Sequence, residues 1–411
     1  MANTVPNHHK SATGSRPGAG TNPDSVAGTA VTPVKVLAAM SGGVDSSVAT
    51  ALLAERGYDV VGSMLRFWPD DRRSGAFDLC CSPDAAYDAR RVADEIDIPF
   101  YLLDFRDRFQ EIVIDPFVPA YQAGATPNPC VWCNREIKFG AFVKRAQALG
   151  CDYMATGHYV RRVDGPSGVE LHRGIDDDKD QTYFLWALPR EILKYLLFPL
   201  GELTKVQVRE LAAERGLLTA DKPSSSGLCF VPTTVKSYLQ EALAQVPGPD
   251  APRGEVIDAS DGYKVVGHHD GVALFTIGQR KGLGMFHSHL ERYVIELRAD
   301  TNQVVVGEKH LCQWPRLVAG RRNLLVADDD VPSRVMAQVR YRQTPEPASL
   351  RLLDGERFEL VFDDPQFAVA VGQSAVLYEG ERLLGGGVIE ERTGEPAAVP
   401  VDAVVAPSAP R

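Results

Sequence analysis

The stretch SGGVDSS, Ser41–Ser47, decides the fold of this chain, because it joins a strand-like run to a helix-like run. The run before it, VKVLAAM (34–40), is apolar and partly β-branched, which is typical of a strand buried on both faces. The run after it repeats apolar residues at helical spacing until Gly57, where we expect the helix to end. A Gly-rich turn between a strand and a helix N-terminus directs backbone N–H groups at one point, so the stretch predicts an anion-binding loop.

The side chains of this loop suit the phosphates of a nucleotide. Gly42 and Gly43 let a phosphate approach the backbone closely, and the serines add hydroxyl donors. Asp45 would hold a Mg²⁺ ion that bridges phosphate oxygens. No lysine follows the glycines, which excludes a Walker A loop. A tight turn with a serine cap and no ligand is the alternative that the loop alone leaves open.

Strand-like and helix-like runs alternate from the start of this motif to about Phe230. We expect strands at 34–40, 59–68, 98–105 and 151–159, and helices at 85–96, 137–150 and 202–216. This alternation predicts an α/β domain over 33–244, in which helices flank a parallel sheet and the ligand lies at the carboxyl ends of the strands. Short β-like runs with frequent turns then predict two small β domains, at 245–328 and 329–393, the second of them a β-barrel.

The composition of the 411 residues is that of a soluble globular chain, with 44% hydrophobic and 24% charged residues. No run approaches the roughly twenty apolar residues of a membrane-spanning helix, and residues 1–32 lack the apolar core of a secretory signal. We therefore expect a cytoplasmic protein without membrane contact, with a disordered leader at 1–32 and a disordered tail at 394–411. The net charge of −10 argues only weakly against nucleic acid binding, since phosphate contacts need only a local basic face.

The seven cysteines follow no framework spacing, which predicts thiol, metal or redox chemistry in a reducing compartment rather than structural disulfides. Cys130 and Cys133 precede a predicted helix, whose dipole would favour a thiolate. Cys229 stands in the Ser- and Gly-rich segment DKPSSSGLCF (221–230). We expect Cys151 and Cys312 to be buried packing residues.

A structural zinc site is an alternative for the pair of Cys130 and Cys133. The cysteines that would complete it, Cys80 and Cys81, are adjacent in the sequence and poorly spaced for chelation.

SGGVDSS resembles the PP-loop of the ATP pyrophosphatases, enzymes that adenylate a substrate and release pyrophosphate. Together with segments elsewhere, it indicates one family of that superfamily. From about Val34 to Glu391 the chain resembles the tRNA-specific 2-thiouridylases (the MnmA or TrmU family). The matching motifs, in chain order, are SGGVDSS, TPNP, CNREIKFG, ATGHY, KDQTYFL, SSSGLCF, FTIGQRKGLG, RYRQ, GQSAVLYEG and LGGGVI.

The resemblance implies ATP-dependent thiolation of carbon 2 of the wobble uridine, in the anticodon stem-loop of tRNAs for lysine, glutamate and glutamine. The 2-oxo group would attack the α-phosphate, pyrophosphate would leave, and a persulfide on Cys229 would deliver sulfur to the adenylated base. Cys133 would attack that persulfide or trap its outer sulfur, which leaves a Cys133–Cys229 disulfide. The sulfur would come from a separate donor or relay protein.

The resemblance also assigns binding residues by motif. For ATP these are Ala39, Met40, Ser41, Gly42, Gly43, Val44, Asp45, Ser46, Met64 and Gly157. For the target base and the remaining tRNA they are Asn128, Pro129, Cys130, His158, Lys179, Asp180, Gln181, Arg340, Tyr341 and Gln373.

Cys130 departs from the family pattern, which commonly reads TPNPD and gives the Asp an acid/base role. A thiol is a poor substitute for a carboxylate base near neutral pH, so that role is in doubt here. Cys130, Cys133 and Cys229 would instead suit a [4Fe–4S] cluster with one iron open to sulfide. The sequence leaves the persulfide route and the cluster route open.

Three other functions compete with thiolation. An adenylating ligase or synthetase for a small molecule would use the loop but would give Cys133, Cys229 and the β domains no role. A non-catalytic RNA-binding protein with a relic loop would not retain a complete SGGVDSS beside paired cysteines. A thioredoxin-type redox protein would show different surroundings of the two cysteines.

Overall fold

The computed structural model describes residues 33–67, 83–223, 227–244, 253–286 and 291–396. The predicted leader, the predicted tail from 397 onward, and Cys80 and Cys81 lie outside these residues. Within the described ranges, no helix has the length and apolar character needed to cross a bilayer.

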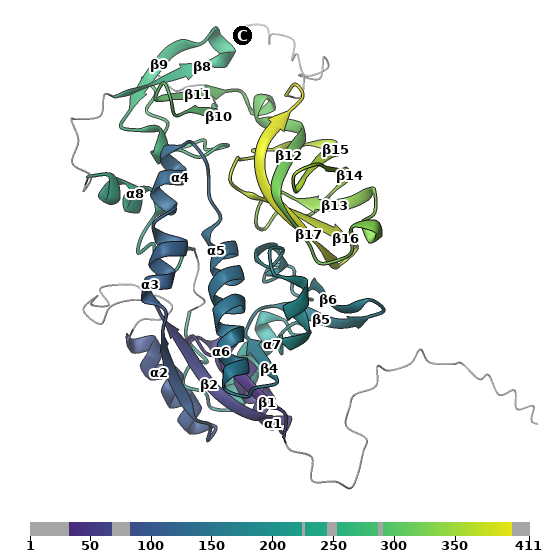
Figure 1. The fold of residues 1–411 in the computed structure, drawn as a ribbon. Helices are drawn as coiled ribbons and strands as arrows, with labels where there is room; N and C mark the ends of the chain where they lie inside the picture. Colours follow the sequence, from purple (N-terminus) through teal and green to yellow (C-terminus); the bar gives the residue numbers. More distant parts are fainter. Residues whose placement is uncertain (1–32, 68–82, 224–226, 245–252, 287–290, 397–411) are drawn as a thin grey trace, which may run out of the picture. The chain divides into compact units, whose positions relative to one another are not determined.

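A parallel sheet in the order β3-β2-β1-β4-β7 forms the first part of the fold (Figure 1). Its strands are β1 (Lys35–Ala39), β2 (Asp59–Arg66), β3 (Phe100–Asp104), β4 (Tyr153–Thr156) and β7 (Leu196–Leu197). The predicted parallel α/β sheet is therefore confirmed. The chain leaves β1 toward β2 and β3 and returns to β4 on the other side of β1. This reversal is the point where open α/β sheets bind ligands.

The helices on this sheet cover it with short apolar side chains. They include α1 (Val44–Glu55), α2 (Pro83–Glu95) and α7 (Lys205–Glu214). Val44 and Val48 of α1 share one buried cluster with Ala89 and Val92 of α2 and Val208 of α7. This packing holds the N-terminus of α1, and the loop before it, against the edge of the sheet where β1 ends.

One continuous helical segment carries the first pair of cysteines. It consists of α5 (Pro129–Trp132), the π-helix η2 (Cys133–Ala141) and α6 (Phe142–Ala148). The segment starts at Pro129, eight residues before the predicted start at 137, because proline at the first helical position has the φ angle that a helix needs. Cys130 and Cys133 therefore lie within the helix rather than ahead of it.

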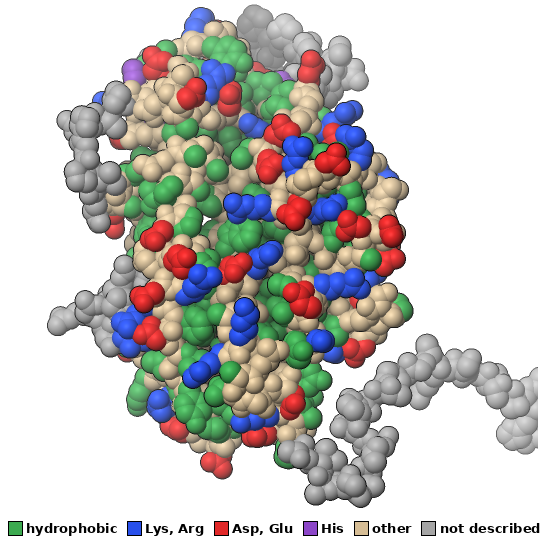
Figure 2. Space-filling view, viewed as in Figure 1, with side chains coloured by type: hydrophobic (Ala, Val, Ile, Leu, Met, Phe, Trp, Pro, Cys, Tyr) green, Lys and Arg blue, Asp and Glu red, His purple; other side chains and the backbone are tan. Residues whose placement is uncertain are grey.

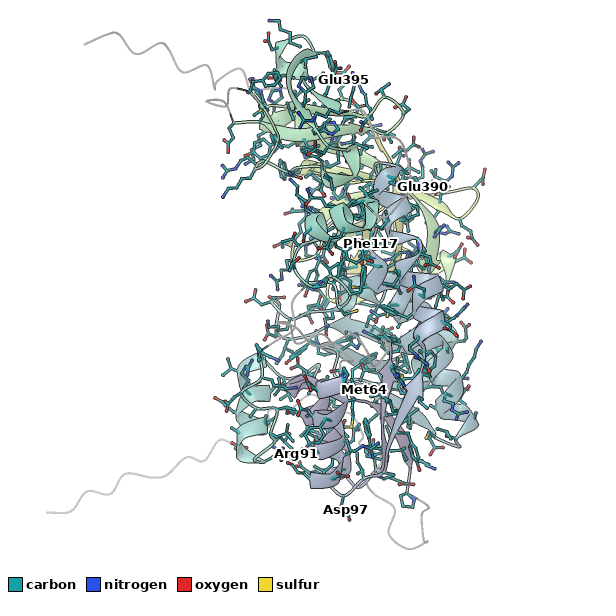
Figure 3. The ribbon with its side chains drawn as sticks, turned by 90° about the vertical axis from the view of Figure 1, so that its left-hand side faces the viewer. Met64, Arg91, Asp97, Phe117, Glu390 and Glu395 are labelled. Atoms are coloured by element: carbon teal, nitrogen blue, oxygen red, sulfur yellow. The ribbon has the colours of Figure 1, made fainter. Side chains whose placement is uncertain are left out.

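Short helices fill the connections. They are α3 (Arg106–Phe109), η1 (Gln110–Ile114), α4 (Phe117–Gln122), η3 (Thr182–Phe184), η4 (Arg190–Tyr195), α8 (Val235–Ala244), η5 (Ala259–Asp261), η6 (Val272–Leu274), η7 (Lys309–Cys312) and η8 (Asp328–Asp330). Phe117 of α4, labelled in Figure 3, packs edge-on against Phe230, with 4.9 Å between the ring centroids. Because Phe230 follows Cys229 directly, this contact fixes the chain at one side of that cysteine.

A mixed sheet in the order β10-β11-β8-β9 follows. Its strands are β8 (Gly254–Asp258), β9 (Lys264–His269), β10 (Tyr293–Arg298) and β11 (Gln303–Gly307). The alternating valines of β11, Val304 and Val306, are fully buried with Val256 and Val294. The predicted central β domain is therefore present.

The C-terminal part is a closed barrel, as predicted. The order β12-β15-β14-β13-β16-β17 returns on itself because β12 also pairs with β17. The strands are β12 (Gln313–Leu324), β13 (Arg334–Gln338), β14 (Glu346–Leu353), β15 (Arg357–Phe367), β16 (Ser374–Glu379) and β17 (Arg382–Thr393), green to yellow in Figure 1. The hairpin of β5 (Val160–Gly165) and β6 (Gly168–Arg173) joins the edge of β17, where Arg382 pairs with His172.

The start of the barrel differs from the predicted boundary after residue 328. β12 pairs with β15 and β17, so residues 313–324 belong to the barrel by their hydrogen bonds. The polar stretch DDDVPS (328–333) lies between β12 and β13, and it is a connection inside the barrel rather than a linker between domains.

Candidate active site

One large cavity, of about 550 Å³, lies beyond the ends of β1 and β4. We call it the main cavity. Its walls come from the SGGVDSS loop, the α5–η2 segment, the residues after β4, the start of α7, the Cys229 segment and the C-terminal barrel. The residues predicted for the site that line it are Ala39, Met40, Ser41, Asp45, Ser46, Asn128, Pro129, Cys130, Cys133, Gly157, His158, Lys179, Gln181, Cys229, Tyr341 and Gln373.

The loop after β1 is closed by its own serines. The Ser41 amide donates to Ser46 Oγ at 3.0 Å, and Ser46 Oγ and Ser47 Oγ each donate to the Gly43 carbonyl at 3.0 Å. Gly42 has φ +71°, and a Cβ there would lie 2.2 Å from the Ala85 carbonyl oxygen. Only glycine therefore fits at position 42, where the loop packs against the first turn of α2.

Gly157 lets the chain after β4 approach the same loop. A Cβ at this position would stand 2.8 Å from the Ser46 amide nitrogen and 2.9 Å from the Asp45 carbonyl carbon. The missing side chain thus lets the backbone after β4 pack closely against the first turn of α1. This close approach joins the two sides of the reversal between β1 and β4.

Asp45, in the first turn of α1, accepts two hydrogen bonds at one carboxylate oxygen. Tyr159 Oη donates to Asp45 Oδ1 at 2.7 Å, and Lys205 Nζ lies 2.5 Å from the same atom. Burial, together with the nearby Asp45 charge, raises the pKa of Tyr159, so its hydroxyl keeps its proton and donates it. Burial lowers the pKa of Lys205, and the bond to Asp45 opposes that change.

Lys205 and Lys222 are residues of this region that sequence reasoning missed. Lys205 is the first residue of α7 and lines the main cavity. Lys222 donates to the Gly42 carbonyl at 3.0 Å and forms an ion pair with Asp88. The Thr204–Gln207 capping box marks where α7 begins, but it gives no sign that Lys205 reaches a loop 160 residues away.

The three cysteines predicted for chemistry line the main cavity together. Cys133 is buried, and Cys130 and Cys229 are half-buried. All three carry thiol side chains in this structure. Across the part of the chain that the structure describes, no three His, Cys, Asp or Glu side chains lie close enough to hold a metal ion. The cavity therefore brings these thiols to one space without grouping them as cluster ligands.

Cys151 and Cys312 are buried packing residues, as predicted. Burial raises the pKa of Cys151, and it raises the pKa of Cys312 to about 12. Neither thiol lines the main cavity.

The C-terminal barrel holds the segment that precedes the cysteines. Gln373 Nε2 donates to the Thr126 carbonyl at 3.0 Å, and the Thr126 amide donates to the Val371 carbonyl at 2.8 Å. Asn128 Nδ2 donates to Ser374 Oγ at 3.3 Å, and Ser374 Oγ also accepts from Trp186 Nε1 at 2.9 Å. These contacts connect the barrel to the start of α5, where Cys130 and Cys133 lie.

Aromatic side chains line the main cavity beside the helical segment α5–η2, which we call the cysteine helix; Asn134 Nδ2 of η2 donates to the Phe184 carbonyl at 3.1 Å. The rings of Phe184 and Tyr341 lie 4.5 Å apart between centroids, and Tyr183 lies 6.0 Å from Tyr341. All three line the main cavity. Side chains of this kind stack on unpaired bases.

His158 and Gln181 line the cavity with defined hydrogen bonds. His158 Nδ1 lies 2.8 Å from Thr156 Oγ1, and burial lowers the pKa of His158 to about 3, so its ring is neutral at physiological pH. Gln181 Oε1 accepts from the Tyr159 amide at 3.0 Å.

The remaining residues predicted to bind ATP or tRNA lie outside the cavity lining. They are Gly42, Gly43, Val44, Met64, Asp180 and Arg340. Met64, labelled in Figure 3, is buried on β2, while its neighbour Leu65 reaches the cavity. The Asp180 carboxylate accepts from the Gly174 amide at 3.1 Å and from Thr182 Oγ1 at 2.7 Å, so it holds the backbone around it.

Figure 2 shows basic and acidic side chains interspersed over the face in view. The basic side chains that line the main cavity are Lys138, Lys179, Lys205 and Arg342.

Three family models match the chain in sequence. They are described as a tRNA methyl transferase HUP domain (residues 34–233), a tRNA methyl transferase PRC-barrel domain (236–308) and an aminomethyltransferase beta-barrel domain (315–389). The last match begins within β12, in agreement with the strand pairing that assigns this strand to the barrel.

Several curated proteins are similar over most of the chain, and each is named tRNA-specific 2-thiouridylase MnmA. The protein from Deinococcus radiodurans is 54% identical over 88% of this chain and 93% of its own length. The protein from Thermus thermophilus is 52% identical over 86% of this chain and 94% of its own length. The protein from Carboxydothermus hydrogenoformans is 47% identical over 87% of this chain and 98% of its own length.

Proposed function

The chain belongs to the family of tRNA-specific 2-thiouridylases, and from this premise we propose that it thiolates the wobble uridine of tRNA at carbon 2 with consumption of ATP. The observation that carries the proposal is the main cavity, which the PP-loop, Cys133 and Cys229 line together. An adenylating loop and two thiols in one space suit a reaction that first activates an oxygen and then replaces it with sulfur.

The PP-loop side of the cavity would carry out the activation. The uridine 2-oxo oxygen attacks the α-phosphorus of ATP, and the bond from that phosphorus to the bridging oxygen breaks. Its electron pair leaves with pyrophosphate, and the base carries AMP on its oxygen. A carbonyl oxygen is a poor leaving group, whereas AMP is a good one, so this step prepares the carbon for a sulfur nucleophile.

The cysteine side would deliver the sulfur. A donor protein leaves a persulfide on Cys229, and the outer sulfur attacks carbon 2 while AMP departs. Cys133, as thiolate, attacks the Cys229 sulfur and breaks the S–S bond of the persulfide. The products are 2-thiouridine, AMP, pyrophosphate and a Cys133–Cys229 disulfide, which an external thiol reductant must open before the next turnover.

Residues on the remaining walls suit an unstacked base. Phe184 and Tyr341 offer ring faces for stacking, and His158, neutral at physiological pH, offers a hydrogen bond without a charge. We propose the anticodon stem-loop of tRNAs for lysine, glutamate and glutamine as the substrate and a sulfur relay protein as the partner, in the cytoplasm.

ATP would bring Mg²⁺ to Asp45. Mg²⁺ in nucleotide sites uses one or two carboxylates plus phosphate oxygens, and Asp45 is a single carboxylate at the lining of the cavity. The residues therefore fit this ion, which would neutralise phosphate charge.

A [4Fe–4S] cluster does not fit the described arrangement, although Cys130, Cys133 and Cys229 share the cavity. Three cluster ligands must surround one centre, and no such group of side chains occurs among the described residues. We therefore derive no step through a cluster and propose the persulfide route.

The test is a reconstituted thiolation assay. The full chain, ATP, Mg²⁺ and tRNA for glutamate are incubated with a persulfide-charged donor protein, and 2-thiouridine and AMP are measured. We expect both products in equal amounts and neither without tRNA. AMP formation that does not depend on tRNA would support instead an adenylating enzyme for a small molecule.

A further inference from the structure

The PP-loop carries no cation of its own for the phosphates that it is shaped to bind. Ser41–Ser47 contains one charged side chain, and that is the acidic Asp45. Backbone N–H groups and serine hydroxyls contact phosphate oxygens, but they leave most of the charge of a triphosphate uncompensated. A lysine supplied from elsewhere in the fold would meet this need.

Lys205 stands at the loop, although it is 160 residues away in sequence. Its Nζ lies 2.5 Å from Asp45 Oδ1, and its side chain is 12% exposed and lines the main cavity. Asp45 follows the glycines of the loop by two residues, so the ammonium group lies where the phosphate chain would enter. Lys222 also contacts the loop, but it is paired with Asp88 and lies outside the cavity lining.

The position of Lys205 is determined by its backbone rather than by its ion pair alone. Its amide donates to Asp176 Oδ2 at 2.8 Å, and the Thr204–Gln207 capping box fixes the first turn of α7. Val208 of α7 is fully buried in the cluster that includes Val44 and Val48 of α1. A side chain that starts from such a fixed point loses little entropy when it exchanges one anionic partner for another.

We propose that Lys205 binds the β- and γ-phosphates of ATP and stabilises pyrophosphate as it leaves. This proposal rests on the proposed function, since it takes ATP as the substrate. Without ATP, Asp45 neutralises the Lys205 ammonium group; with ATP bound, Lys205 donates to phosphate oxygens, and the Asp45 carboxylate would be available to hold Mg²⁺. As the bond from the α-phosphorus to the bridging oxygen breaks, the charge that collects on pyrophosphate faces Lys205.

The test compares ligands with and without the outer phosphates. Lys205→Met removes the charge but keeps much of the side-chain volume, and Lys205→Arg keeps the charge. Lys264→Met serves as the matched control, because Lys264 forms an exposed ion pair with Asp261 outside the main cavity. Binding of Mg·ATP, Mg·pyrophosphate and AMP to the full chain is measured by calorimetry, and thiolation of tRNA is measured beside it.

We expect Lys205→Met to weaken Mg·ATP and Mg·pyrophosphate binding about 10- to 100-fold, the loss of one charge-assisted hydrogen bond or more, and AMP binding less than about 3-fold. Lys205→Arg should recover part of the pyrophosphate affinity, and Lys264→Met should match the wild type. A lysine that only holds α7 to α1 would instead lower the affinity for all three ligands alike.

Equal losses for AMP and pyrophosphate, or unchanged pyrophosphate affinity in Lys205→Met, would overturn the role of Lys205. Either result, obtained while the wild-type chain thiolates tRNA, would leave the proposed function standing. A wild-type chain that binds neither Mg·ATP nor pyrophosphate would overturn both, and the wild type alone would reveal it.

Discussion

Gln373 of the C-terminal barrel donates a hydrogen bond from Nε2 to the backbone carbonyl of Thr126, at 3.0 Å, across 247 residues of sequence. Thr126 begins the TPNPCVWC segment, so a barrel residue holds the chain at the base of the cysteine helix. The next barrel residue, Ser374, accepts hydrogen bonds from both Asn128 and Trp186. The barrel therefore positions the start of the helix that carries Cys130 and Cys133.

Ser374→Ala should weaken this connection. The change leaves the buried Trp186 Nε1 and Asn128 Nδ2 donors without their acceptor, which costs about 1–3 kcal/mol of the free energy of unfolding. Urea unfolding measures that loss, and thiolation should fall more than the affinity for ATP. Ser349→Ala, at an exposed position on β14, is the control and should change neither. Equal losses of thiolation and ATP affinity would contradict a local effect on the cysteine helix.

Cys130→Ala separates the persulfide route from an iron–sulfur route. If Cys133 and Cys229 carry the sulfur transfer, the variant should retain at least about half of the thiolation rate, since Cys130 takes no covalent step. Iron and acid-labile sulfide are measured in anaerobically prepared wild-type protein. Stoichiometric iron that Cys130→Ala loses together with activity would contradict the persulfide proposal.

Cys133→Ser and Cys229→Ser should each abolish thiolation. A serine hydroxyl carries no persulfide and is a far weaker nucleophile than a thiolate. Calorimetric ATP affinity should stay within about 3-fold of the wild type, because the PP-loop wall is unchanged. Cys151→Ala is the control, since that thiol is buried away from the main cavity. Thiolation that survives in either serine variant would show that sulfur travels by another path.

Gly157→Ala should disrupt the PP-loop. Its Cβ would lie 2.8 Å from the Ser46 amide nitrogen, so backbone must move and the loop loses its shape. We expect a loss of about 1–3 kcal/mol in the free energy of unfolding and of most ATP affinity. Gly216→Ala provides the comparison, because Gly216 has φ +64° and open space around it. This variant should lose about 1 kcal/mol of the free energy of unfolding and no ATP affinity. Intact ATP binding in Gly157→Ala would contradict the role of this close approach.

His158 should make the protein less stable as the pH falls. Burial lowers its pKa to about 3 in the folded chain, against 6.5 for an ordinary histidine. Between these two pKa values the unfolded chain binds a proton that the folded chain does not. The contribution of neutral His158 to the free energy of unfolding is therefore complete above pH 6.5, and it falls by up to about 1.4 kcal/mol per pH unit below that pH. The free energy of unfolding, measured with urea at several pH values between 5 and 7, should change less with pH in His158→Asn than in the wild type. An equal pH dependence in the two proteins would mean that His158 has an ordinary pKa in the folded chain.

The local elements were predictable from the sequence because neighbouring residues determine them. The run before Ser41 is apolar and β-branched and forms β1, and Gly57 and Gly216 follow the ends of their helices with positive φ angles. The PP-loop was also identifiable from residues adjacent in the chain, whereas the roles of Cys133 and Cys229 followed only from the resemblance to the 2-thiouridylase family. The boundary after residue 328 failed as a marker, since a polar turn inside a barrel has the same composition as a linker.

The sequence by itself determined the PP-loop with its glycines and the order of an α/β domain and two β domains. Each of these follows from residues that are close together in the chain. The sequence also shows which cysteines stand in Gly-, Ser- or Pro-containing segments. Only the tertiary structure decided that Lys205 reaches Asp45, that Lys222 reaches Gly42 and that Gln373 reaches Thr126. It also decided that Asp180 holds backbone instead of lining the cavity. Such pairings depend on how distant elements pack, and a lysine at a ligand site has the same local sequence as a lysine in solvent.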